Sequence, residues 1–164
     1  MGAVDSWTRF SQWMVGVVVG ALLYGNAIAA ETATDLNGAW EGTLGVLYEP
    51  GKEPKSPETF TLRLEINDQS VRVFLKQDGK WINAKPGAFR IQRYRANAVL
   101  AAIDSGNAED GTWTETRNIA VAPKSDDTLL AIYARLVTNE DLPVTAEHKT
   151  FGVAGKGELN RVKR

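Results

Sequence analysis

The segment Thr59–Asn67 is the feature that most constrains the fold of this chain. Every second residue in it is apolar and the residues between are polar, the apolar ones being Phe60, Leu62, Leu64 and Ile66. Successive side chains of a β-strand point to opposite faces, so this pattern predicts a strand with one face on a core and one in water.

The same alternation recurs along the chain, and turn signals separate its segments. Asn67-Asp68-Gln69 indicates one turn, and Gln77-Asp78-Gly79-Lys80 indicates a hairpin because Asp-Gly accepts backbone angles that bulkier residues resist. Pro86-Gly87 ends a short strand around Trp81, and the stretches SGNAEDG and PKSDD have the composition of loops. The remaining expected strands begin at Ala39 or cover Val71–Leu75, Ala88–Arg95, Ala98–Asp104, Thr112–Ala122, Thr128–Thr138 and Lys149–Val162.

Short turns between most of these segments favour an antiparallel meander. Closing a meander removes its exposed edges, which favours a barrel over an open sheet. The sequence therefore predicts an all-β protein, a single antiparallel up-and-down β-barrel of about 8 strands. The proline-rich stretch Tyr48–Glu58 is expected to be a loop over one barrel mouth or an irregular connection.

The first residues have a different character from the rest. The apolar run Trp13–Tyr24 is shorter than the roughly 20 residues that span a bilayer, and Ala27 and Ala29 follow it in an A-x-A arrangement. We expect residues 1–29 to be a cleavable signal peptide and residues 30–164 to be the barrel domain, an uncleaved anchor being the alternative. The chain has no cysteine, and the expected location is periplasmic or secreted.

Composition limits the classes of function. The formal net charge is −1, so no basic surplus exists to bind nucleic acid, and no membrane span is expected after signal cleavage. With no cysteine and one histidine, His148, the chain offers no metal-ligand spacing. We predict no catalytic residue, metal or other cofactor, and leave a protein partner open.

The start of the first expected strand contains a short sequence signature. Gly38-Ala39-Trp40 resembles the G-x-W signature of lipocalins and the wider calycin superfamily, and Arg161 matches the basic residue that these families place against that tryptophan. The resemblance implies a barrel sealed at one end by Trp40, holding a small apolar or amphipathic ligand. The chain departs from classical lipocalins because it is shorter, has no disulfide and shows no clear helix after the strands.

Charged residues share faces with core residues in two segments. Glu115 and Arg117 alternate in phase with Ile119, and Arg93 does so with Ile91. Charges inside a barrel are costly unless they pair or meet a ligand, and an arginine there can grip a carboxylate with two parallel hydrogen bonds. A one-residue bulge would instead turn them to solvent, or they would lie at the mouth paired with each other.

The leading hypothesis is an exported barrel that binds a small apolar or amphipathic molecule. Its candidate ligand-binding residues are aromatic walls and polar groups that orient the ligand: Trp40, Arg93, Trp113, Glu115, Arg117 and Tyr133. The alternatives are a solid barrel that docks a protein or cell-envelope component through its loops, and an enzyme that uses carboxylates at the mouth.

Overall fold

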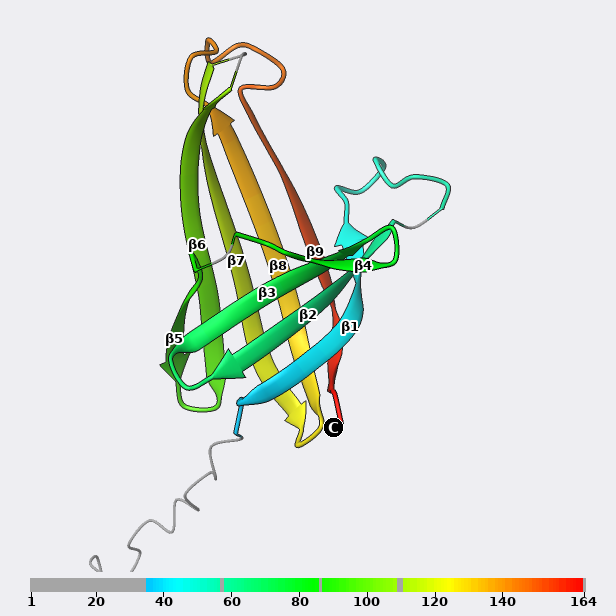
Figure 1. The fold of residues 1–164 in the computed structure, drawn as a ribbon. Helices are drawn as coiled ribbons and strands as arrows, with labels where there is room; N and C mark the ends of the chain where they lie inside the picture. Colours follow the sequence, from blue (N-terminus) through cyan, green and yellow to red (C-terminus); the bar gives the residue numbers. More distant parts are fainter. Residues whose placement is uncertain (1–34, 57, 86, 109–110, 164) are drawn as a thin grey trace, which may run out of the picture. The chain divides into compact units, whose positions relative to one another are not determined.

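A computed structural model describes residues 35–56, 58–85, 87–108 and 111–163 (Figure 1). These residues form a single nine-stranded antiparallel sheet and no helix, which confirms the all-β prediction. The expected signal peptide, residues 1–29, lies outside the described residues. None of the described segments is a helix of the length and apolarity that crossing a bilayer requires.

The strands follow the predicted order closely. They are β1 (Gly38–Leu47), β2 (Thr59–Asn67), β3 (Ser70–Gln77), β4 (Lys80–Asn83), β5 (Arg90–Tyr94), β6 (Asn97–Ala108), β7 (Gly111–Ser125), β8 (Thr128–Asn139) and β9 (Thr150–Arg161). Consecutive strands pair except β4 with β5, and β1 pairs with β9, which gives the order β4-β3-β2-β1-β9-β8-β7-β6-β5. The sheet therefore consists of two meanders, β1–β4 and β5–β9, joined through β1 and β9.

The structure differs from the predicted closed barrel at the two edge strands of the sheet, β4 and β5. In the described part of the chain no backbone ladder joins β4 to β5, so the strands do not form a closed hydrogen-bonded ring. Side chains bridge this gap instead: Arg93 of β5 donates to the carbonyl of Asp68 at 2.9 Å, and Lys85 forms an ion pair with Asp104 of β6. β4 has only four residues and pairs with Phe74–Gln77, the C-terminal half of β3.

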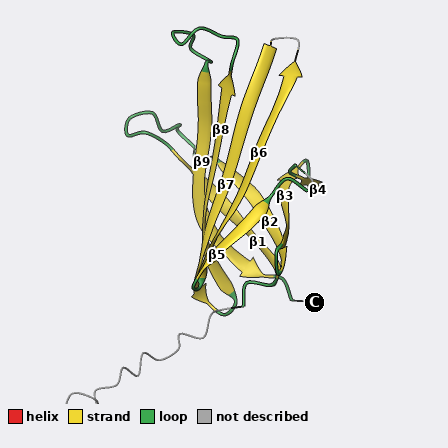
Figure 2. Cartoon of the chain, turned by 90° about the vertical axis from the view of Figure 1, so that its left-hand side faces the viewer, coloured by secondary structure: helices red, strands yellow, loops and turns green. Residues whose placement is uncertain are grey.

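The sheet curls so that β1–β4 lie across one face of β6–β9, as Figures 1 and 2 show from two directions. We call the face of each strand that points into this curl the inward face. Apolar residues of the inward faces fill the space between the two meanders, and the largest fully buried ones include Trp40, Leu44, Leu62, Leu64, Leu100, Ile119, Leu129 and Leu159. The alternation in Thr59–Asn67 thus places Leu62, Leu64 and Ile66 in the core, with Phe60 packed at its margin.

Two strands extend through stretches that were expected to be loops. Ser105–Ala108 belong to β6 and Pro123–Ser125 belong to β7. Gly106 lies opposite Trp113 in the ladder, and a Cβ atom at Gly106 would approach the indole ring to 2.9 Å. The glycine in this stretch therefore makes room for an aromatic side chain within a strand rather than marking a turn.

Candidate functional site

The charged residues of β7 lie on its inward face. The register of β7 against β8 runs without interruption from Trp113 to Pro123, so no bulge separates Glu115 and Arg117 from Ile119. Glu115 is 5% exposed and Ile119 is fully buried. Glu115 and Arg117 therefore face inward, and no bulge turns them to solvent.

Glu115 sits between two arginines. Arg135 donates from Nη2 to Oε2 of Glu115 at 2.9 Å, and Nε of Arg117 is in ionic contact with Oε1 of the same carboxylate. Arg117 and Arg135 are direct partners in the β7–β8 ladder, which brings both guanidinium groups to one place. Glu115 and Arg117 therefore both face inward and form an ion pair with each other.

Arg135 was not among the predicted site residues. It follows Tyr133 by two positions on β8, in phase with the buried residues Leu129 and Ala131. The same alternation that singled out Glu115 and Arg117 in β7 therefore pointed to Arg135 in the neighbouring strand.

The electrostatics of the cluster follow from burial and from the arginines. Burial raises the pKa of Glu115, but the hydrogen bond from Arg135 and the charges of Arg117, Arg135 and Lys85 outweigh it, so this pKa lies below its ordinary value of 4.5. The hydrogen bond to Glu115 raises the pKa of Arg135. At neutral pH the three groups carry two positive charges and one negative charge.

The cluster leaves one buried polar atom without a partner. Among the described residues, none bonds to Nε of Arg135, which is shielded from solvent, whereas Oε1 of Glu115 and Nε of Arg117 have each other as ion-pair partners. Buried polar groups are almost always hydrogen-bonded, and an exception calls for a partner such as a ligand or an ordered water.

A pocket of about 430 Å³ opens beside the two arginines. Its walls come from both meanders, and the lining residues are Phe60, Leu75, Lys76, Gln77, Arg117, Tyr133, Arg135 and Val153. The rings of Phe60 and Tyr133 meet edge to face with their centroids 5.1 Å apart. Gly155 provides the space for this contact, because a Cβ atom there would lie 2.6 Å from the Phe60 ring. The pocket thus combines apolar walls with two guanidinium groups and the ammonium-bearing side chain of Lys76.

Tyr133 and Trp113 occupy different parts of the inward face. Tyr133 lines the pocket, and burial raises the pKa of its hydroxyl. Trp113 lies four residues before Arg117 and does not line the pocket; its ring lies 4.9 Å from Nζ of Lys85, which also pairs with Asp104. The hydrogen bond from Lys85 lowers the pKa of Asp104. Trp113 therefore belongs to the side-chain bridge between the sheet edges.

Trp40 lies away from the pocket, at the end of the sheet where Arg161 pairs with it in the β1–β9 ladder. Its indole nitrogen donates to the carbonyl of Leu36 at 2.9 Å. The guanidinium of Arg161 lies 4.1 Å from the indole centroid and donates to the carbonyls of Asn37, Asp35 and Asp126. The contact expected between Trp40 and Arg161 is therefore present, and it closes this end of the core.

Arg93 also lies near that end. Its Nη2 donates to the carbonyl of Asp68 at 2.9 Å and contacts Oδ1 of Asn37 at 3.4 Å. The six predicted ligand-binding residues thus divide: the structure brings Glu115, Arg117 and Tyr133 together, keeps Trp113 nearby and places Trp40 and Arg93 elsewhere.

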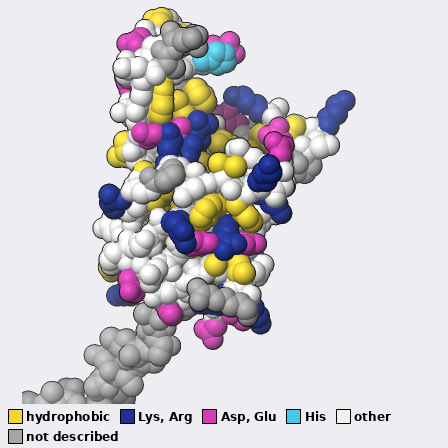
Figure 3. All heavy atoms as spheres, in the orientation of Figure 1, with side chains coloured by type: hydrophobic (Ala, Val, Ile, Leu, Met, Phe, Trp, Pro, Cys, Tyr) yellow, Lys and Arg dark blue, Asp and Glu magenta, His cyan; other side chains and the backbone are white. Residues whose placement is uncertain are grey.

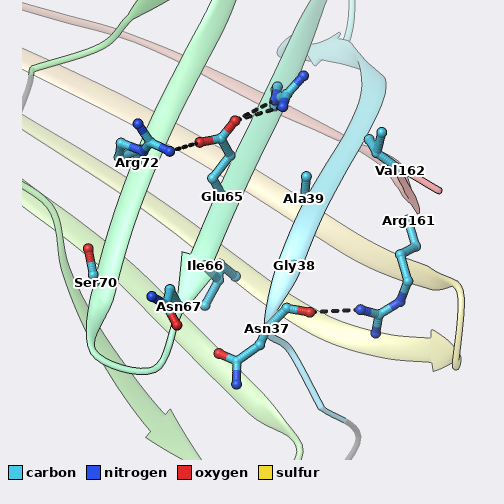
Figure 4. A pocket seen from close by; sticks show the side chains of 11 residues that line it. Asn37, Gly38, Ala39, Glu65, Ile66, Asn67, Ser70, Arg72, Arg161 and Val162 are labelled. Carbon is cyan, nitrogen blue, oxygen red and sulfur yellow. Dashed lines mark hydrogen bonds and ion pairs between the residues drawn. The ribbon is translucent and has the colours of Figure 1, made fainter. Parts of the chain in front are cut away.

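A second hollow of about 780 Å³ lies beside the Trp40 end, on the outer side of β1–β3 (Figure 4). Its charged groups already have partners: Arg161 donates to the Asn37 carbonyl at 2.7 Å, and Glu65 forms ion pairs with Arg63 and Arg72, the latter marked in the close-up. We therefore regard this hollow as a surface depression lined by a salt-bridge network.

No group of three histidine, cysteine, aspartate or glutamate side chains suited to a metal ion occurs among residues 35–163 where the structure describes them. Comparison of the chain with protein-family models, with curated proteins and with solved structures finds no match.

Proposed function

We propose that this protein binds a small amphipathic anion in the pocket between β2–β3 and β7–β9. The apolar part of the ligand packs against Phe60, Leu75, Tyr133 and Val153, and its anionic group meets Arg117 and Arg135. The observation that supports the proposal is that two arginines in the pocket wall share one buried carboxylate.

Charge balance favours an anionic group. Glu115 neutralises one of the two guanidinium groups, and Lys76 adds a further positive charge to the pocket lining, so the wall carries a net positive charge beside apolar side chains. Uncompensated charge in such a place is costly, and a carboxylate removes that cost by accepting two parallel hydrogen bonds from an arginine. A carboxylate on an apolar body therefore fits the pocket better than a neutral molecule of the same shape.

The size of the pocket is compatible with a small ligand. A volume of about 430 Å³ lies within the range of about 300–1,000 Å³ of small-molecule sites. The ligand occupies only part of the interior, because the region around Trp40 and Leu44 is fully packed. We also propose that the barrel-like fold resembles lipocalins, on the support of the G-x-W sequence and the Trp40–Arg161 contact. We propose export on separate support, namely the apolar run Trp13–Tyr24 and the A-x-A arrangement that follows it.

Isothermal titration calorimetry with decanoate and decanol as probes tests the proposal. We expect wild-type protein to bind decanoate at least about tenfold more tightly than decanol. Arg117→Gln should remove this preference because it removes a guanidinium from the pocket wall. Arg93→Gln is the matched control, since Arg93 lies outside the pocket, and it should retain the preference. Failure of wild-type protein to bind decanoate, or unchanged binding by Arg117→Gln, would contradict the proposal.

A further inference from the structure

Glu115 lies beneath the two arginines of the pocket. Its side chain is 5% exposed, against 15% for Arg117 and 35% for Arg135, so solvent reaches the guanidinium groups more readily than the carboxylate. Among the residues that the structure describes, Glu115 is the only charged residue that is buried. An anionic ligand that enters the pocket therefore meets the arginines, and it competes there with the carboxylate that they already share.

The groups that surround Glu115 come from several strands. The titratable and charged ones are Arg117 on β7, Arg135 and Tyr133 on β8, Asp104 on β6, Lys85 after β4, and Lys76 on β3, which lines the pocket. β9 contributes the apolar Val153, which lies opposite Arg135. Asp104 is the ladder partner of Glu115, but its charge is paired with Lys85. The charges in direct contact with ionised Glu115 are therefore the same two arginines that the ligand uses.

The cluster lies where the long strands emerge from under β1–β4. Figure 3, drawn in the orientation of Figure 1, shows acidic and basic side chains gathered over β6–β8 above the crossing strands, with hydrophobic side chains beside them. A ligand and a proton therefore both have access to this part of the inward face from solvent.

We propose that the pocket takes up a proton together with its anionic ligand, and that Glu115 holds this proton. The inference rests on the proposed function. As the ligand's anionic group pairs with Arg117 and Arg135, a proton from solvent binds to a carboxylate oxygen of Glu115, so the guanidinium groups exchange one counter-charge for another. Glu115 thus acts as a positioning residue, because it holds both guanidinium groups in place before binding and releases them to the ligand.

The direction of the pH dependence follows from the charges. Although burial raises the pKa of Glu115, the arginines hold it below its ordinary value of 4.5 in the free protein. A ligand anion on the same guanidinium groups places a second negative charge beside the carboxylate, which raises the pKa of Glu115 in the complex. The complex then binds more protons than the free protein, so the ligand binds more tightly as pH falls through the pKa of the complex. Each unit between the two pKa values corresponds to about a tenfold gain in affinity at low pH.

Isothermal titration calorimetry with decanesulfonate at about pH 7 and about pH 4.5 tests the inference. A sulfonate keeps its negative charge over this range, whereas a carboxylate ligand is itself protonated in acid. Wild-type protein should bind decanesulfonate about tenfold more tightly at the lower pH. Glu115→Gln has an uncharged side chain at both pH values, so it should bind decanesulfonate tightly at both and lose the pH dependence.

Asp104→Asn is the matched control for the loss of a carboxyl group. Asp104 lies opposite Glu115 in the β6–β7 ladder, but it pairs with Lys85 rather than with the pocket arginines. This variant should therefore keep the pH dependence of wild-type protein.

Proton uptake by wild-type protein tests the inference without a mutation, in case Glu115→Gln fails to fold. Binding enthalpies measured at about pH 5 in two buffers of different ionisation enthalpy should give an uptake between about 0.3 and 1 proton per ligand. Wild-type protein that binds decanesulfonate equally at both pH values, or without proton uptake, would overturn the inference and leave the proposed function standing. So would a pH dependence that Glu115→Gln retains or that Asp104→Asn removes. Wild-type protein that binds decanesulfonate at neither pH would overturn both.

Discussion

The arginines at the two ends of the core have different surroundings. Near Trp40, the guanidinium of Arg161 lies on the indole and donates to three backbone carbonyls. Beside the pocket, Arg117 and Arg135 share the single carboxylate of Glu115, and among the described residues Nε of Arg135 has no hydrogen bond. Arg161 therefore has the surroundings of a structural residue, while the pocket pair has unused capacity for an anion.

Packing differs between the same two regions. Trp40, Leu44 and Leu159 are fully buried around the Arg161 end, whereas the pocket beside Arg117 remains open. Mutations at the Arg161 end should therefore change stability alone, whereas mutations at the pocket end should change both stability and ligand binding.

Truncation of Trp40 should have the largest effect on stability. Trp40→Ala removes a fully buried side chain, its hydrogen bond to Leu36 and the surface on which Arg161 stacks. We expect a loss of about 3–5 kcal/mol in the free energy of unfolding, measured by urea denaturation. A loss below about 1 kcal/mol would contradict the assignment of Trp40 to a packed end.

Glu115→Gln should give the next largest loss of stability and the sharpest contrast with Trp40→Ala. It leaves two partly buried guanidinium groups without their shared counter-charge, which we expect to cost about 3 kcal/mol in urea denaturation. The same change frees both arginines for an external anion, so decanoate should bind more tightly in calorimetry. Unchanged or weaker decanoate binding would show that Glu115 helps to hold the anion rather than competing with it.

Arg161→Lys should destabilise the protein moderately. Lysine keeps the charge but cannot reproduce the planar fork that reaches the carbonyls of Asn37, Asp35 and Asp126. We expect a loss of about 1–2 kcal/mol in thermal denaturation, with decanoate binding unchanged. A variant that keeps full stability would show that the hydrogen bonds of Arg161 contribute little.

Acidification should give the smallest effect. The pKa of Glu115 is lowered in the folded protein, so its ionised form contributes stability that is present above the ordinary pKa of 4.5 and is lost as pH falls through the folded pKa. The melting temperature should therefore decline below about pH 4.5, and this decline should be smaller in Glu115→Gln. Equal declines in both proteins would assign the acid sensitivity to other carboxyl groups.

Local alternation was sufficient to predict most of the fold. The period-two pattern in Thr59–Asn67 and the Asp78-Gly79 turn fixed strand positions because each reports on neighbouring residues. The gap between β4 and β5 was not predictable in this way. It depends on which distant edges meet, and short strands such as Lys80–Asn83 carry little pattern.

The candidate site was predictable only in part. Alternation identified Glu115 and Arg117 as inward-facing. It shows which face of the sheet a side chain lies on, but not which end of the sheet it lies near. Trp40 and Arg93 were therefore grouped with Glu115 although the ladders place them toward the other end. Alternation also assigned Arg135 to the inward face of β8, but its position beside Glu115 depends on the register that aligns Arg117 with Arg135.

The most direct test is the effect of decanoate on the arginine Nε–H signals in a nitrogen–proton NMR spectrum of the protein. We predict that the signals of Arg117 and Arg135 shift during the titration, because both guanidinium groups lie in the pocket wall. The Arg161 signal should stay in place. Shifts at Arg161, or none at Arg117 and Arg135 while decanoate binds, would contradict the account.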